Sequence, residues 1–269
     1  MLGTFLLPFL CIYGVIIAPF QQAGKVPSCK DLVNILDLGI IISNDLQWHH
    51  HHDHILDKAY KILGVIRRTF SQSNSVITKV KLYTALVRSQ LTYCSLIWRP
   101  YLIQDIYKLE QVQRRATKYI LNDYLSDYKT RLLHLNIFPL MYIFEISDIM
   151  FLVKSFKFPS DSFNINNYIS FSTGVTRSSG VKLVHNSSST NKERSHYFVR
   201  VCRLWNCLPI IDLNLSIQTI KKHLKIYLWN HFIANFESSN IHSYYFLCPC
   251  SSCFNHPSSS NFSHLINNS

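Results

Sequence analysis

Glycine and acidic residues are the groups that this sequence has little of. Of its 269 residues, 7 are glycine, which disfavours an all-β protein built on many tight turns. No GxGxxG or GxxxxGK[ST] stretch occurs, so a glycine-rich phosphate-binding loop is excluded. The eight cysteines are scattered apart from three near the C-terminus, unlike the dense pattern of a disulfide-stabilised domain.

The shortage of carboxylates bears directly on catalysis. The chain has 15 Asp and Glu residues, and no two Asp are adjacent. Two-metal phosphoryl transfer needs carboxylates that hold two cations about 4 Å apart. The GxSxG turn that presents a nucleophilic serine is also missing. The sequence therefore predicts no enzymatic activity and no cofactor.

Basic and apolar residues, by contrast, are abundant. Lys and Arg number 27, which gives a net charge of +12. Hydrophobic residues make up 48% of the chain, enough for a packed core, and this excludes global disorder. A basic, folded chain of this kind indicates a phosphate-bearing or membrane-surface partner.

Apolar residues recur at helical spacing in five segments and predict a mainly α-helical fold. The segments are 54–70, 76–98, 106–120, 128–157 with an interruption near Pro139, and a helix that starts near Ser216. A short β element is expected near residues 37–42, with short strands around 168–171 and 181–184. On the first two helices, the side chains expected to point outward include Lys58, Lys61, Arg68, Lys79, Lys81 and Arg88. On the helix that starts near Ser216, the expected inward residues are Ile217, Ile220, Leu224, Leu228 and Phe232, and the expected outward residues are Lys221, Lys222 and Lys225.

Composition divides the chain into five regions. They are an apolar N-terminal segment (1–30), a helical domain (31–158), a flexible Ser/Asn-rich loop or hinge (159–195), a C-terminal helical region with a Cys-rich end (196–253) and a polar tail expected to be disordered (254–269).

The helix of residues 106–120 has two unlike faces. Ile106, Leu109, Val112, Ala116 and Ile120 fall on one face. The other carries Lys108, Gln111, Arg115 and Lys118, with Arg114 beside them and Glu110 as the one acidic interruption. A surface helix held by ion pairs would alternate its charges. This face does not alternate, and it is interpreted either as a face for a nucleic-acid backbone or as a solvated surface without a partner.

Two groups of residues raise the question of a metal site. His50 and His54, within the run HHHHDH at 49–54, could share one helix face, but a solvated His-rich helix start is the preferred interpretation. In the tail, Cys248, Cys250, Cys253 and His256 have spacing related to that of zinc sites. Zinc is one alternative there, and reduced surface thiols are the preferred one.

The first 24 residues carry no charge, and about 20 apolar residues are enough to cross a bilayer. A transmembrane helix is therefore one hypothesis, although Pro8 and Pro19 weaken it. A signal peptide fits less well, because no Lys or Arg precedes the apolar run. A third hypothesis is that the segment is incidental to the domain that follows.

Six segments follow one another along the chain in a characteristic order and spacing: DLGIIISNDLQWHHHHDHI, KAYKILGVIRRTF, LYTALVRSQLTYCSLIWRPY, IYKLEQVQRRATKYIL, YKTRLLHLNIFPL and HYFVRVCRLWNCLP. Together they resemble the C-terminal part of the reverse transcriptase of non-long-terminal-repeat retrotransposons, of the jockey or related long-interspersed-element type. The resemblance covers roughly residues 31–253. It implies a helical, thumb-like bundle after the last strand of the palm, with the catalytic Asp-Asp palm missing from this chain.

In that family the thumb helices contact a template–primer duplex. The resemblance therefore implies nucleic-acid contacts, to RNA or DNA as duplex or hybrid, at Arg67, Arg68, Arg88, Arg114, Arg115 and Lys118. One departure is that Ile143 and Phe144 stand where family members usually carry a basic pair after the Pro-Leu. The apolar N-terminal segment has no family counterpart.

Three hypotheses about function follow. The chain is a non-catalytic remnant of a reverse transcriptase that binds nucleic-acid backbone non-specifically, a membrane-anchored helical protein, or a product without function. The first implies a nuclear or cytoplasmic location, and the second a membrane location.

Overall fold

The computed structural model describes residues 34–43, 47–70, 75–159, 164–172, 182–184 and 196–247. In this part of the chain the fold is mainly helical, with two small antiparallel two-stranded sheets, as predicted. One hydrophobic core runs from Ile55 to Phe246, so the C-terminal helices pack against the same core as the N-terminal ones. Residues 1–30, Cys248, Cys250, Cys253 and His256 lie outside the described residues, and the predictions made for them stay predictions.

The chain enters the described region through a β-hairpin. Strands β1 (Asn34–Asp37) and β2 (Ile40–Ser43) pair antiparallel, with Asp37 opposite Ile40. Leu38 and Gly39 form the turn, with φ angles of 47° and 84°. A two-residue turn with both φ values positive matches the twist of a hairpin. The β element predicted at 37–42 is thus present, but the chain reverses direction inside it.

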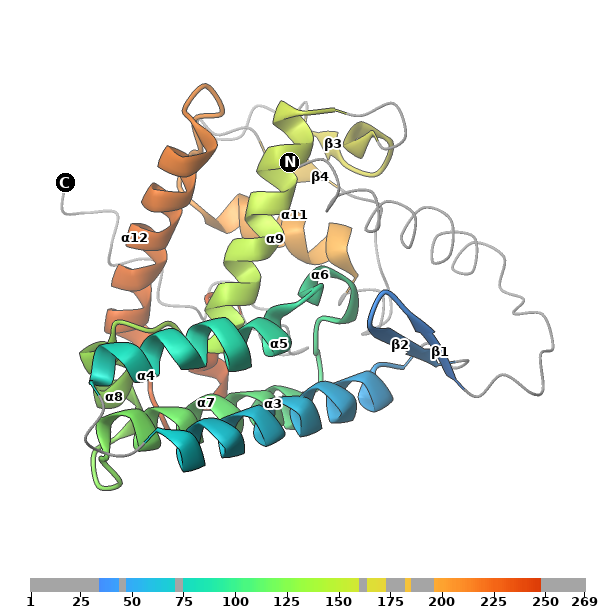
Figure 1. Ribbon diagram of the computed structural model, residues 1–269. Helices are drawn as coiled ribbons and strands as arrows, with labels where there is room; N and C mark the ends of the chain where they lie inside the picture. The colour runs from blue at the N-terminus through green and yellow to red at the C-terminus, as the bar shows by residue number, and fades with distance from the viewer. Residues whose placement is uncertain are drawn as a thin grey trace.

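Two long helices follow and lie along the lower edge of the molecule (Figure 1). They are α3 (His49–Thr69) and α7 (Ile103–Leu121). Between them in sequence come α4 (Val76–Leu82), the π-helical η2 (Tyr83–Arg88), α5 (Ser89–Thr92) and α6 (Ser95–Trp98).

The single helix predicted over residues 76–98 is interrupted near its end. Cys94 has a φ of 52°, in the left-handed region, and α6 restarts after it. The reason is tertiary: Trp98 is completely buried, and its indole Nε1 donates to the Tyr93 carbonyl across the break, at 2.8 Å. The prediction that Lys79 points outward is also wrong. Lys79 is 2% exposed, and its ammonium lies 5.2 Å from the centre of the Tyr119 ring.

Helix α9 (Leu140–Lys157) forms the centre of the bundle, preceded by α8 (Tyr128–Leu135) across the predicted break at Pro139. Apolar residues surround α9 on most sides, which is typical of a buried core helix. Helices α11 (Tyr197–Cys207) and α12 (Ile217–Asn235) pack against it (Figure 1). On α12 the predicted inward residues Ile220, Leu224, Leu228 and Phe232 are buried.

The remaining elements are short. The 3-10 helix η3 (Ile165–Asn167) and strands β3 (Ser170–Phe171) and β4 (Leu183–Val184) fall in the Ser/Asn-rich region, and the strands match those predicted there. The 3-10 helix η4 (Ile241–Tyr244) ends the described chain. Across the described ranges, no single helix has both the length and the apolar character of a membrane span. Helices α8 and α9 have them only together, with a 51° bend between them.

Candidate nucleic-acid interface

Helix α7 has the apolar face predicted from its sequence. Ile106, Leu109, Val112, Ala116 and Ile120 are at most 1% exposed and pack in the core. Glu110, expected to interrupt the basic face, is instead buried with them. The outer face of α7 is therefore more uniformly basic than the sequence indicated.

Glu110 is held in a buried polar network that explains its position. Its carboxylate accepts hydrogen bonds from the Tyr128 hydroxyl, from the Gln113 amide at 3.2 Å and from the Leu140 backbone N–H at 3.0 Å. The Tyr83 hydroxyl donates to the Gln113 side-chain oxygen at 2.7 Å. Burial raises the pKa of Glu110 to about 7. This network joins α7 to η2, α8 and the start of α9, which fixes the orientation of the basic face.

Helices α3 and α7 run parallel, in a register set by contacts at both ends. Near their first turns, His52 Nδ1 lies 3.4 Å from the Asp105 carboxylate, and Asp53 pairs with Lys108 at 3.9 Å. At their last turns, the Tyr119 hydroxyl donates to the Phe70 carbonyl at 2.6 Å. The outward rows of the two helices therefore run side by side, and we call the surface strip between them the α3–α7 groove.

The first half of the α3–α7 groove holds a pocket of about 390 Å³. The side chains that line this α3–α7 pocket include both charges and two aromatic rings: Asp53, Leu56, Asp57 and Tyr60 from α3, and Tyr107, Lys108, Gln111 and Arg115 from α7. The two carboxylates and two cations balance. The guanidinium of Arg115 lies 4.8 Å from the centre of the Tyr60 ring.

The second half of the groove is basic. On α3, Gly64 lies one helical turn beyond Tyr60 and Arg67 lies two turns beyond it, and on α7 Lys118 lies one turn beyond Arg115. A Cβ atom at Gly64 would meet only the Arg68 guanidinium, at 3.7 Å, so no side chain of α7 covers that position. No Asp or Glu occurs between Asp57 and Asp105, so this half of the groove has no carboxylate on α3.

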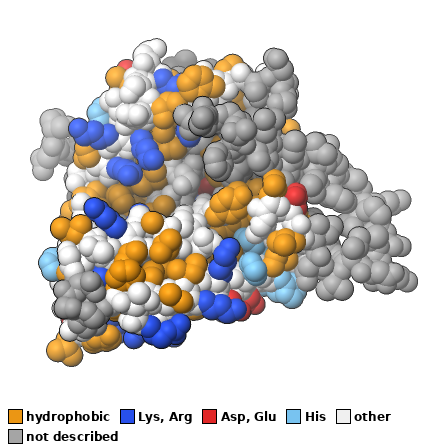
Figure 2. Space-filling view, in the orientation of Figure 1, with side chains coloured by type: hydrophobic (Ala, Val, Ile, Leu, Met, Phe, Trp, Pro, Cys, Tyr) orange, Lys and Arg blue, Asp and Glu red, His pale blue; other side chains and the backbone are white. Residues whose placement is uncertain are grey.

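The structure brings only part of the predicted site together. Arg67 and Arg68 are exposed in the last turn of α3, and Arg115 and Lys118 follow one another on the outer face of α7. Figure 2 shows Lys and Arg side chains gathered along the lower edge, over α3, and a separate group over α12. Arg67, Arg68 and Lys118, together with Arg115 at the border with the pocket, thus make up the basic surface of the groove.

Arg114 has partners inside the protein. Its Nη2 donates to the Ser238 carbonyl at 2.6 Å. Its guanidinium lies 4.4 Å from the centre of the Tyr128 ring and 5.5 Å from that of Tyr244. Arg114 therefore attaches the segment after α12 to α7. Because its guanidinium is engaged within the protein, Arg114 is not part of the basic surface of the groove.

Arg88 lies apart from the groove, next to α12. Burial, together with the charges of Lys221 and Arg88, lowers the pKa of Lys225. The three cations therefore lie close enough to repel one another. Lys221 and Lys225 were expected to point outward, but nothing in the sequence connected them with Arg88.

The His-rich start of α3 is only half solvated. His50 and His54 are exposed, whereas His51 and His52 are buried beside the Trp98 ring, so the solvated interpretation is wrong for these two. Burial lowers the pKa of His51 to about 4, so its ring is neutral at neutral pH. Within the described part of the chain, no three His, Cys, Asp or Glu side chains are placed to share a metal ion.

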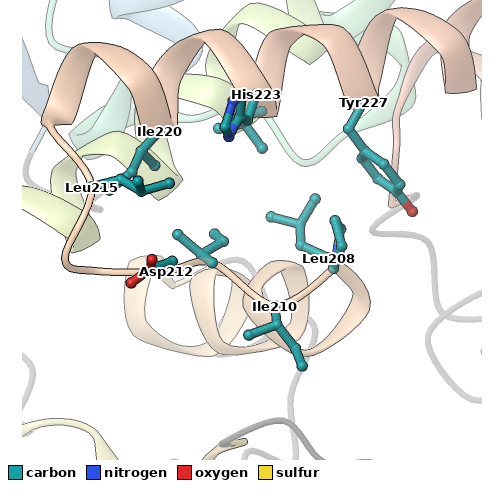
Figure 3. Close-up of a pocket in the computed structure, with 10 residues that line it drawn as sticks. Leu208, Ile210, Asp212, Leu215, Ile220, His223 and Tyr227 are labelled. Atoms are coloured by element: carbon teal, nitrogen blue, oxygen red, sulfur yellow. The ribbon is translucent and has the colours of Figure 1, made fainter.

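A second pocket, of about 130 Å³, lies between α12 and the segment that follows α11 (Figure 3). Its walls are mostly apolar, including Leu208, Ile210 and Ile220, with Tyr227 at one end and His223 above. None of the predicted nucleic-acid residues lines it. It therefore has no part in the basic surface.

Sequence reasoning missed the residues that shape the first half of the groove: Asp53, Asp57, Tyr60 and Tyr107. The pairing of Asp53 with Lys108 depends on the parallel register of two helices far apart in sequence, and no local pattern encodes that register. Comparison of this chain with protein-family models, with curated proteins and with solved structures finds no match in any of the three.

Proposed function

We propose that this protein binds the sugar–phosphate backbone of RNA or DNA, duplex or hybrid, without sequence preference, along the basic half of the α3–α7 groove. The observation that carries the proposal is that Arg67 and Arg68 on α3 and Arg115 and Lys118 on α7 are at least partly exposed on two helices that pack side by side in parallel. Cations that meet phosphates release condensed counterions, and this gives affinity without reading bases.

The rigid support of this surface favours binding over simple solubility. The buried Glu110 network and the apolar side of α7 hold the backbone of that helix in place. The hydroxyl of Tyr119 attaches its last turn to the end of α3. A fixed spacing between cations reduces the entropy lost when they engage a regular row of phosphates.

The origin we propose is the thumb of a retrotransposon reverse transcriptase without its catalytic palm. A hairpin followed by a helical bundle, with basic residues on two long helices, is consistent with that origin. The function proposed for this chain is binding of nucleic acid alone, without a catalytic step.

The wild-type chain should bind a short fluorescent duplex with a dissociation constant on the order of 10⁻⁴ to 10⁻⁶ M at physiological salt. The logarithm of the association constant should fall linearly with the logarithm of salt concentration, and duplexes of unrelated sequence should give the same line. Fluorescence anisotropy at several salt concentrations measures both. Affinity that does not depend on salt would contradict backbone binding.

A further inference from the structure

The α3–α7 pocket differs from the basic surface beside it, and its lining points to a different kind of ligand. Phosphate binding does not explain two carboxylates in a groove that is otherwise basic. Asp53 and Asp57 oppose Lys108 and Arg115, so the pocket carries no net formal charge. An anion and a cation are both poorly matched, and a neutral ligand with hydrogen-bond donors and acceptors fits better.

The aromatic side chains define the shape of such a ligand. Tyr107 lines the pocket and is 50% exposed, so its side chain has room for a stacking partner. The ring of Tyr60, in contrast, is already covered by the Arg115 guanidinium at 4.8 Å. An open tyrosine face beside cations is the arrangement on which unpaired bases stack in single-strand binding proteins.

We propose that the α3–α7 pocket holds one unpaired guanine of a nucleic-acid strand whose backbone lies on the adjoining basic surface. This inference rests on the proposed function for the path of the strand, whereas the contacts to the base involve the pocket residues alone. Guanine has two polar edges that fit the lining. The Asp57 carboxylate accepts from N1–H and the N2 amino group, and the Lys108 ammonium donates to O6 and N7.

The position of each residue is consistent with these roles. Asp57 lies one turn after Asp53, whose carboxylate is engaged by Lys108 at 3.9 Å. Tyr107 and Lys108 are adjacent at the start of α7, so the stacking ring and the cation reach the pocket from one turn. Arg115 lines the pocket on the side nearer Lys118, where its guanidinium meets the phosphate of the bound nucleotide.

The test uses the full chain and labelled duplexes that are blunt or carry a thymine overhang with one guanine or one adenine in it. The guanine overhang should bind about tenfold more tightly than the adenine overhang. Asp57→Asn should bring that ratio close to one and should not weaken blunt-duplex binding, because it removes a negative charge from the groove. Asp212→Asn, a matched loss of one exposed carboxylate elsewhere, should keep the ratio.

A second variant separates stacking from the reading of base edges. Tyr107→Ala should weaken the binding of both overhang duplexes about tenfold and leave the binding of the blunt duplex unaffected. Equal affinity for guanine and adenine, or a guanine preference that survives Asp57→Asn, would overturn the assignment. If the blunt duplex fails to bind while the guanine preference persists, the backbone proposal fails and the pocket assignment is supported. If no nucleic acid binds, both are overturned.

Discussion

Replacing Asp148 with Asn should lower the free energy of unfolding by about 3–5 kcal/mol, because it leaves two arginines without their counter-charge in the core. Asp148 is fully buried on α9. Its carboxylate lies 3.1 Å from Arg99 Nη1 and 2.8 Å from Arg200 Nε. Arg99 is buried as well, so water cannot replace the lost carboxylate.

Chemical denaturation monitored by circular dichroism measures this effect. Asp53→Asn is the matched control, because Asp53 is exposed and its pair with Lys108 spans 3.9 Å in solvent. Exposed pairs of this kind contribute on the order of 1 kcal/mol or less. Similar losses for the two variants would show that the Asp148 cluster does not hold α9 against α11.

Relative to the wild-type protein, the Glu145→Gln variant should become more stable as pH rises. Glu145 is buried on α9, and its carboxylate accepts the backbone N–H groups of Phe246 at 2.9 Å and Leu247 at 3.1 Å. Burial raises its pKa from 4.5 to about 7. A carboxyl group with a raised pKa in the folded state stabilises the fold below the unfolded pKa, and that contribution is lost as pH rises to about 7.

The size of the expected effect follows from the shift in the pKa of Glu145. Between about pH 4.5 and 7, the wild-type protein should lose about 3 kcal/mol of unfolding free energy that the neutral Gln variant keeps. The comparison must be a difference between variants, because His51 and His231, with pKa values lowered to about 4 by burial, contribute in the opposite direction. Glu237→Gln, at an exposed position, should follow wild type. Parallel pH curves for wild type and Glu145→Gln would contradict the account.

Local periodicity was sufficient to predict the helices whose environment is simple. Helix α7 has one apolar and one polar face, and α12 has a single buried row, so spacing alone identified their inward residues. The interruption at Pro139 and the two short strands of the Ser/Asn-rich region were also evident from turn-forming and β-branched residues.

The errors come from side chains whose position depends on distant partners. Lys79 faces inward because the Tyr119 ring receives its ammonium, and His51 and His52 are buried because the Trp98 ring lies beside them. Cys94 interrupts a helix that local sequence would continue. None of these contacts has a signal in the residues next to it in sequence.

The candidate site was predictable as a set of basic residues but not as a surface. Arg115 and Lys118 were assigned to one helix face from spacing alone. That they lie on the same surface as Arg67 depends on the parallel register of α3 and α7. The attachment of Arg114 to Ser238, and the proximity of Arg88 to Lys225, depend on where α12 and the segment after it pack.

The most direct test of backbone binding in the groove compares two triple variants with equal loss of charge. One changes Arg67, Arg115 and Lys118 to Gln, and the other changes Lys221, Lys222 and Lys225 on α12 to Gln. All six side chains are at least partly exposed, so both variants should stay helical by circular dichroism.

The measured quantity is the slope of the logarithm of the association constant against the logarithm of salt concentration, with the same duplex throughout. Each phosphate contact contributes about 0.9 to this slope. The groove variant should therefore lose about 2.7 from the magnitude of the slope, and the α12 variant should match wild type. Equal slopes for all three proteins, or a loss confined to the α12 variant, would contradict the assignment of the groove.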